Sequence, residues 1–178
     1  MLTAITGGIA EGKSTVLGYL ASLGHPSISA DEVGRALFDD PSINSELARI
    51  AGVPSPIDRP TLRERLVTDP QVRRAVNRTM HPRIMEAIAA SGAQFVEVPL
   101  LFETCLQGAF ESIWVVTCGT VEQRRRLHAR YGPEFDIDSI LSTQLPTKAK
   151  LAFADVVIRT NRPEQDVKNS VSKAIESR

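Results

Sequence analysis

The chain has 178 residues, enough for one domain with a substantial core and too few for two domains of ordinary size. Its 21 basic and 21 acidic residues balance, so no net field attracts nucleic acid or an anionic membrane, and an anionic ligand has to be held by local clusters. The two cysteines lack metal-ligand spacing, and there is no long apolar run or apolar leader, so we expect a cytoplasmic protein without nucleic-acid or membrane partners.

A glycine-rich segment close to the start, Gly7–Ser14, fits the pattern G-x-x-x-x-G-K-[ST] at every fixed position. The short apolar run 2–6 precedes it, and 14–23 follows with apolar residues at helical spacing. In a strand, loop and helix of this order, backbone N–H groups cradle phosphates, Lys13 reaches the β and γ phosphates, and the Ser14 hydroxyl ligates Mg²⁺. An ordinary glycine-rich turn is the alternative, but the context favours a site for a nucleoside triphosphate.

A second short strand, 27–30, leaves Asp31 at its carboxyl end, where ligands bind in open α/β sheets. Asp is also favoured as a helix N-cap, and one residue can serve both purposes. The sequence from Asp31 to about Gly92 is helical, which indicates an insertion between core strands. It is rich in arginine, and most of these arginines are expected to be solvated surface charges. The expected helices are 32–38, 43–50, 61–67 and 70–90.

The rest of the chain alternates between strands and helices. The apolar centre of 112–118 is unbroken, which suits a strand buried on both faces. Short strands that alternate with helices imply a parallel sheet covered on both faces. The expected strands here are 94–98, 112–118 and 154–158, and the expected helices are 121–130, 137–145 and 164–175.

Residues outside the glycine loop distinguish the classes of P-loop protein. A GTPase would carry N-K-x-D after a later strand, and neither 117–120 nor 159–162 matches it. A kinase needs a carboxylate near the γ-phosphate, arginines on the transferred group and a means of excluding water. Asp31, the pair Arg126 and Arg130 on one helix face, and the helical hairpin 131–150 supply these features.

Several further segments accompany the glycine loop. They are Ser29-Ala30-Asp31, His81-Pro82, Pro99-Leu100-Leu101-Phe102-Glu103, Gln123 with Arg126 and Arg130, Gln144 with Lys150, and Ala154-Asp155 with Ile158 and Asn161. With these residues, the chain resembles the dephospho-CoA kinase family from residue 1 to about residue 162. That family phosphorylates the ribose 3′-hydroxyl of dephospho-CoA with ATP in the last step of coenzyme A synthesis.

The resemblance implies an α/β fold of the P-loop NTPase type, with three layers and a five-stranded parallel sheet. It also implies a single kinase domain that contains a helical CoA-side insertion and a small helical lid. The implied divisions are a core of about 1–31, 93–130 and 151–178, an insertion of about 32–92 and a lid of about 131–150.

By the same resemblance, Asp31 is the base that deprotonates the ribose hydroxyl, and Lys13 and Arg130 stabilise the transferring phosphoryl group. Mg²⁺ would be held by Ser14 and Asp31. The implied ATP-binding residues are Gly8, Ile9, Ala10, Glu11, Gly12, Lys13, Ser14, Thr15, Arg126, Asn161 and Arg162. The implied residues for the acceptor are Asp31, Arg63, His81, Pro99, Leu100, Leu101 and Glu103.

Four positions depart from the pattern of the family, and one of them is Ile140, which stands where an arginine is common. Ala10 and Glu11 stand where Gly and Ser are usual, and we expect the Glu11 side chain to point to solvent. Ser29 replaces the first carboxylate of an Asp-x-Asp pair, which leaves Asp31 as the base. Two alternatives stay open at this point: a kinase of another small acceptor, such as a nucleoside monophosphate or shikimate, and a nucleotide-binding scaffold that has lost catalysis.

Overall fold

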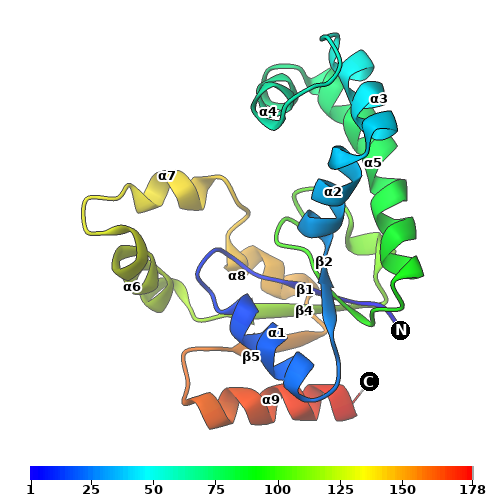
Figure 1. Cartoon of the computed structure of the whole chain (residues 1–178). Coiled ribbons are helices and arrows are strands. Elements are labelled where there is room, and N and C mark those ends of the chain that lie inside the picture. Colours follow the sequence, from blue (N-terminus) through cyan, green and yellow to red (C-terminus); the bar gives the residue numbers. More distant parts are fainter. Residues whose placement is uncertain (178) are drawn as a thin grey trace. The chain divides into compact units, whose positions relative to one another are not determined.

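The computed structural model describes residues 1–177, and its chain forms two compact units (Figure 1). The core unit consists of residues 1–28 together with the chain from Ala93 onward. The helical unit consists of Ser29–Gly92.

The core unit is built on a sheet of five strands in the order β2-β3-β1-β4-β5. Strand β1 pairs in parallel with β3 and β4, and β4 pairs in parallel with β5, which confirms the expected parallel sheet. Because β1 is central, all four of its residues are buried, and so is the apolar centre of β4. The strands are β1 (Thr3–Thr6), β2 (Ser27–Ser29), β3 (Phe95–Glu97), β4 (Ser112–Thr117) and β5 (Val156–Arg159).

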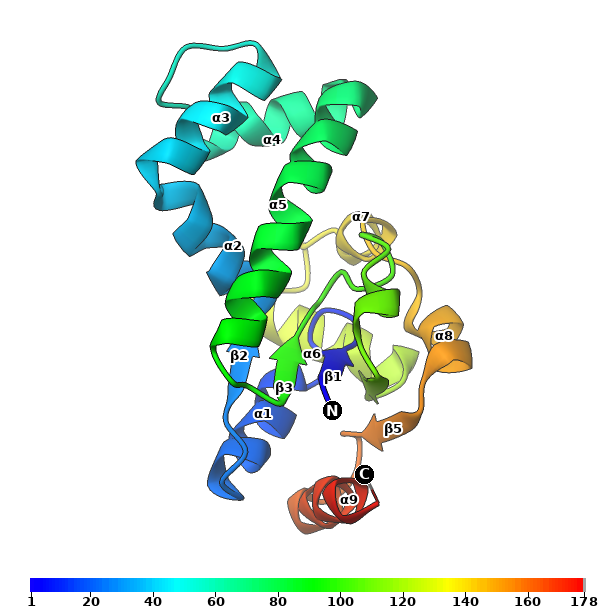
Figure 2. The ribbon, with the colours of Figure 1, turned by 90° about the vertical axis from the view of Figure 1, so that its right-hand side faces the viewer.

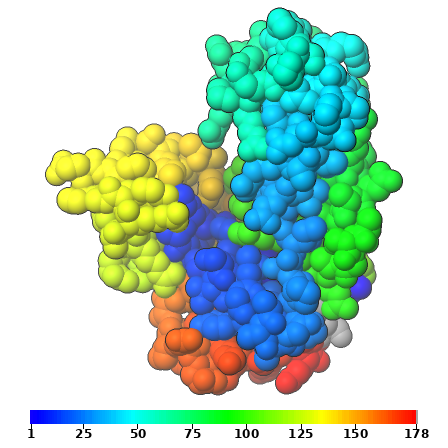
Figure 3. Space-filling view, viewed as in Figure 1, coloured from blue at the N-terminus to red at the C-terminus, as the bar shows by residue number. Residues whose placement is uncertain are grey.

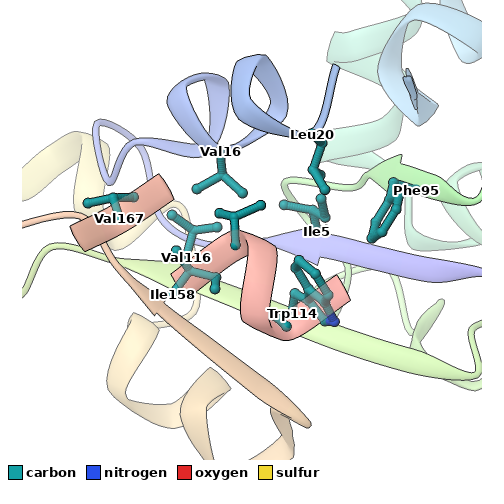
Figure 4. Close-up of a cluster of buried hydrophobic side chains, with 10 residues drawn as sticks. Ile5, Val16, Leu20, Phe95, Trp114, Val116, Ile158 and Val167 are labelled. Atoms are coloured by element: carbon teal, nitrogen blue, oxygen red, sulfur yellow. The ribbon is translucent and has the colours of Figure 1, made fainter. Parts of the chain in front are cut away.

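Two helices of the core unit, α1 (Lys13–Ser22) and α9 (Glu164–Glu176), pack against each other on one face of the sheet (Figures 1 and 2). Figure 4 shows the apolar cluster beneath them, to which α1 contributes Val16, α9 contributes Val167 and β4 contributes Trp114 and Val116. Burying each such side chain stabilises the fold by about 1.5–3 kcal/mol. This packing fixes the first turn of α1 at the carboxyl edge of the sheet.

The remaining helices of the core unit follow β3 and β4 in sequence. The expected helix 137–145 ends early, at Ser142, and a separate turn of helix begins after Pro146, since the residue before a proline is disfavoured in the helical conformation. The surface around α7 is exposed and is yellow in Figure 3. These elements are α6 (Thr120–Tyr131), α7 (Ile137–Ser142), α8 (Thr147–Lys150) and the 3₁₀ helices η1 (Gln107–Ala109) and η2 (Leu151–Phe153).

The helical unit contains α2 (Ala30–Asp39), α3 (Pro41–Ala51), α4 (Arg59–Thr68) and α5 (Pro70–Ala90). Each of the last three helices follows an Asp N-cap and has one proline at its first or second position, an arrangement that favours helix initiation. Their apolar faces share a separate core that includes Leu47, Ala51, Leu62, Val72 and Val76. No helix among residues 1–177 is long and apolar enough to cross a membrane.

Candidate active site

The glycine loop Gly7–Gly12 joins β1 to α1 in a conformation that requires unusual backbone angles. Gly12 has φ 93° directly before α1, and Ala10 has φ 61°, a left-handed conformation that costs a residue with a Cβ about 1–2 kcal/mol. The Lys13 Nζ donates to the carbonyl oxygens of Gly7 and Gly8 at 3.0 Å each. The lysine is therefore folded over the loop that the sequence identified as a phosphate cradle.

The Glu11 side chain is buried, with 1% of the residue exposed, so the expectation that it points to solvent is wrong. Its Oε2 accepts the backbone N–H of Gly8 at 2.6 Å and the hydroxyl of Thr147, and its Oε1 accepts the hydroxyl of Thr117 at 2.8 Å. Three donors satisfy the carboxylate, which is why the fold tolerates its burial.

Two glutamines hold the other side of the loop. Gln123 of α6 donates from Nε2 to the Ile9 carbonyl at 2.9 Å, and Gln144, between α7 and α8, accepts the Ile9 N–H at 3.1 Å. Thr160, in the turn after β5, donates to the Glu11 carbonyl at 2.6 Å. Elements from three distant parts of the chain thus fix the backbone of the loop.

Arg126 and Arg130 have different partners. Arg126 donates to Glu122 Oε1 at 2.8 Å and to the Thr160 carbonyl at 2.7 Å, whereas the Arg130 guanidinium lies 5.2 Å from the centre of the Tyr131 ring. The two guanidinium groups therefore contact different partners in this structure, although both residues were expected on one face of the helix. Hydrogen bonds from Arg125 and Arg126 lower the pKa of Glu122 to about 2, so this carboxylate stays charged.

Ser14 and Thr15 are exposed in the first turn of α1. The resemblance implies Mg²⁺, an ion that commonly takes one or two protein oxygen atoms and completes its shell with phosphates and water. An exposed hydroxyl that follows the lysine of the loop fits that requirement. Among residues 1–177 no cluster of three or more His, Cys, Asp or Glu side chains could hold a metal by itself.

A cavity of about 380 Å³ lies against the loop within the core unit. Its polar lining includes Glu11, Thr117, Gln123, Gln144, Thr147 and Arg159. Asn161 and Arg162, which are expected to bind ATP, are exposed in the turn directly after Thr160. The turn and the glycine loop are joined through Thr160, so both lie at the carboxyl edge of the sheet.

The segment Pro99–Glu103 follows β3 at the same edge. Leu101 is fully buried, as expected for an apolar strand exit, whereas Leu100 is 39% exposed. Glu103 Oε1 lies 2.9 Å from the Nζ of Lys150, which is completely buried. Burial raises the pKa of Glu103, but the hydrogen bonds from Lys150 and from the Leu145 N–H outweigh it and lower the pKa below its ordinary value.

In the helical unit, Asp31 lies in the first turn of α2 and its side chain is exposed. The N-cap is Ser29, whose hydroxyl accepts the Glu32 N–H at 3.4 Å, so the interpretation of Asp31 as the cap is wrong. Asp31 shares a cavity of about 540 Å³ with three arginines. The three arginines are Arg35, Arg59 and Arg63, and the apolar side chains that line the same cavity include Phe38, Leu62 and Ile84.

His81 lies in the middle of α5, immediately before Pro82 inside that helix. It is half-buried, and burial lowers its pKa, which favours the neutral imidazole. It does not line the cavity that contains Asp31 and Arg63. Its assignment to the acceptor side rests on the resemblance alone.

The sequence reasoning missed the threonines that hold the loop. Thr117, Thr147 and Thr160 lie at the end of β4, the start of α8 and the turn after β5, and all three bind Glu11. No local pattern distinguishes a threonine that binds a distant carboxylate from one that faces solvent. A charged residue inside the glycine loop was the one available signal, since a carboxylate there has to be solvated or satisfied by donors.

Comparisons with known proteins agree on one family. The family model described as dephospho-CoA kinase matches residues 1–166. A curated dephospho-CoA kinase of Rhizobium meliloti is 36% identical over 173 residues, which cover 90% of this chain and 89% of the relative. A solved structure from Thermus thermophilus has a TM-score of 0.81 at 27% identity and covers 99% of this chain and 97% of that one. Dephospho-CoA kinase from Campylobacter jejuni has a TM-score of 0.67 at 25% identity, with 99% and 96% covered.

Proposed function

The chain belongs to the dephospho-CoA kinase family, and from this premise we propose that it transfers the γ-phosphoryl group of ATP to the ribose 3′-hydroxyl of dephospho-CoA with Asp31 as the base. The observation that carries the residue assignment is the cavity in which Asp31 stands among arginines and apolar side chains. The products are coenzyme A and ADP, and the phosphoryl group replaces the proton of the hydroxyl.

The donor half of the reaction belongs to the glycine loop. The phosphates would be bound at the N-terminus of α1 and by backbone N–H groups of the loop other than those of Gly8 and Ile9, which Glu11 and Gln144 already accept. Lys13 lies over the loop, where its ammonium group would exchange the carbonyl oxygens of Gly7 and Gly8 for phosphate oxygens. When bound, Mg²⁺ would be held by Ser14 with a contribution from Asp31 and would neutralise charge on the transferring group.

The acceptor half belongs to the helical unit and to the segment Pro99–Glu103. Dephospho-CoA combines phosphates with a long, partly apolar arm, and the cavity beside Asp31 offers both kinds of contact. Its guanidinium groups, among them that of Arg63, suit the phosphates, and Phe38 and Leu62 suit the apolar parts. Leu100 and Leu101 would line the acceptor side of the core unit, with His81 as a further contact.

Helix α6 would supply the remaining positive charge. Arg130 is exposed near the end of α6 and is free to turn from the Tyr131 ring to the transferring phosphoryl group. Arg126 is held against the turn after β5, where Asn161 and Arg162 would contact the adenine of ATP.

We also propose that the reaction takes place in the cytoplasm, a compartment in which free thiols such as Cys105 and Cys118 stay reduced.

The test is conversion of dephospho-CoA to coenzyme A by the purified protein with ATP and Mg²⁺. We expect conversion of dephospho-CoA, and we expect that added nucleoside monophosphates or shikimate do not inhibit it. Asp31→Asn should retain ATP binding and lose about 10²–10⁴-fold in kcat, which is the usual contribution of a general base. Glu32→Gln removes the neighbouring charge in the same turn of α2 and serves as the matched control. Equal turnover by Asp31→Asn and the control would remove Asp31 from the mechanism.

A further inference from the structure

The short helix α8 has a carboxylate bound at each end. At its start, the Thr147 hydroxyl donates to Glu11 of the glycine loop. At its end, the Lys150 ammonium group binds Glu103 at 2.9 Å. We call Glu11, Thr147, Lys150 and Glu103 the α8 strut, because these four residues connect the phosphate loop to the segment Pro99–Glu103.

The loop end of the strut is tightly packed. The same Oε2 of Glu11 that accepts from Thr147 also accepts the Gly8 N–H at 2.6 Å. A Cβ placed on Gly8 would lie 2.8 Å from that oxygen and 2.9 Å from the Thr147 hydroxyl, distances that real Cβ atoms essentially never show. Position 8 therefore has no room for a side chain, because Glu11, Thr147 and Gln123 pack directly against it.

The other end is equally well fixed. Glu103 Oε1 accepts the Leu145 N–H at 2.8 Å as well as binding Lys150, so it holds the chain on both sides of α8. The Phe153 ring in η2, directly after α8, lies 5.4 Å from the ring of Phe102. The segment that precedes the turn of helix and the segment that follows it are both anchored to the same short stretch.

One turn of helix separates the two ends, and the Ala149 N–H closes it on the Pro146 carbonyl at 2.8 Å. A serine at position 11, which the family pattern leads one to expect, has one oxygen on a much shorter side chain. It could not bind Gly8, Thr117 and Thr147 together.

We propose that Glu11 is a positioning residue that acts through Thr147 and α8 to set the segment Pro99–Glu103 relative to the phosphates held by the glycine loop. The proposal rests on the proposed function, in which that segment lines the acceptor side. Phosphoryl transfer needs the attacking oxygen and the γ-phosphate within a few tenths of an ångström of the productive distance, and a misplacement of about 1 Å costs about 10²-fold in rate.

The test compares a variant that lacks the Thr147 hydroxyl with a variant that keeps a hydroxyl at the same position. Thr147→Val should lower kcat tenfold or more, with a smaller change in the KM for ATP, whereas Thr147→Ser should stay within about twofold of the wild type. Glu11→Ala should lower kcat at least as much, because it also removes the contacts to Gly8 and Thr117, and the double variant should be no worse than Glu11→Ala alone, because the Thr147 link is already broken in it. Additive losses, or equal losses in Thr147→Val and Thr147→Ser, would overturn the proposal.

A second measurement does not depend on turnover. Hydrogen exchange is followed on the peptide 99–106, whose Thr104, Cys105 and Leu106 amides are hydrogen-bonded within the segment, with and without a non-hydrolysable ATP analogue. We expect the analogue to slow exchange in the wild type and in Thr147→Ser, and to have no such effect in Thr147→Val. The same response in all three proteins would overturn the proposal for the strut, whether or not the chain shows kinase turnover. Absence of kinase turnover would instead count against the proposed function.

Discussion

Replacing Lys150 by Met should destabilise the core unit by about 3 kcal/mol. The ammonium group is fully buried and lies 2.9 Å from Glu103, whose side chain is 20% exposed. Removing one partner of a buried ion pair costs about 3–5 kcal/mol, because the other charge stays behind without compensation. Glu103 retains the Leu145 N–H and some contact with water, so the expected loss is at the lower end of that range. For a chain of this size, it corresponds to a fall in Tm of about 6–12 °C.

Urea unfolding followed by fluorescence measures this loss directly. Trp114 is the one tryptophan in the sequence, and it is buried in the apolar cluster of the core unit, so the signal reports on the unit that contains the ion pair. Adding Glu103→Gln to Lys150→Met removes the orphaned charge and keeps an acceptor for Leu145. The double variant should therefore recover to within about 1 kcal/mol of the wild type. A single variant within about 0.5 kcal/mol of the wild type, or a double variant as unstable as the sum of both singles, would refute this reasoning.

The same pair predicts how the loss depends on pH. The pKa of Glu103 is lower in the folded protein than its ordinary value of 4.5, so the folded state binds fewer protons than the unfolded state around that pH. The stabilisation is therefore fully present above pH 4.5 and is lost as the pH falls through the lower, folded value. The difference between the wild type and Lys150→Met should narrow in the same range. A difference that stays constant down to pH 3 would contradict this linkage.

Three further outcomes follow from the glycine loop and the cysteines. Lys13→Ala should weaken ATP binding and turnover together, as measured by calorimetry and by the kinase assay, because in the proposed mechanism Lys13 binds the phosphates in both the ground state and the transition state. Ala10→Gly should change the free energy of unfolding by less than about 1 kcal/mol, since relief of φ 61° is offset by the entropy of glycine in the unfolded chain; a loss above 2 kcal/mol in urea would show that the Ala10 methyl group is needed. Burial raises the pKa of the Cys118 thiol to about 11, so iodoacetamide at pH 8 should modify the exposed Cys105 and spare Cys118, as read by mass spectrometry; equal labelling of both would contradict the buried position.

Local sequence patterns were sufficient for the elements. The glycine loop between an apolar strand and a helix predicted β1, the loop and α1, and the helical pattern predicted the helices of the second unit, although α3 and α4 begin at Pro41 and Arg59 rather than at the expected residues 43 and 61. Helix α5 has the bounds that its pattern indicated, Pro70–Ala90. The parallel sheet followed from the alternation of strands and helices, since parallel strands need a crossover connection. Where the pattern was weak, as after Ser142, the prediction extended one helix across a break before Pro146.

Glu11 shows what only the tertiary structure decided. The sequence places a charged residue in the glycine loop, and from the sequence alone the cheapest arrangement for it is contact with water. The fold instead supplies donors from Gly8, Thr117 and Thr147, two of which are more than a hundred residues away in the chain, and this converts an unfavourable burial into a bonded one. The sequence by itself determined the elements, the phosphate loop and the family, because these depend on local spacing. The partners of Glu11 and Lys150 depend on which strand ends and turns meet at one edge of the sheet, and only the packed fold determines that.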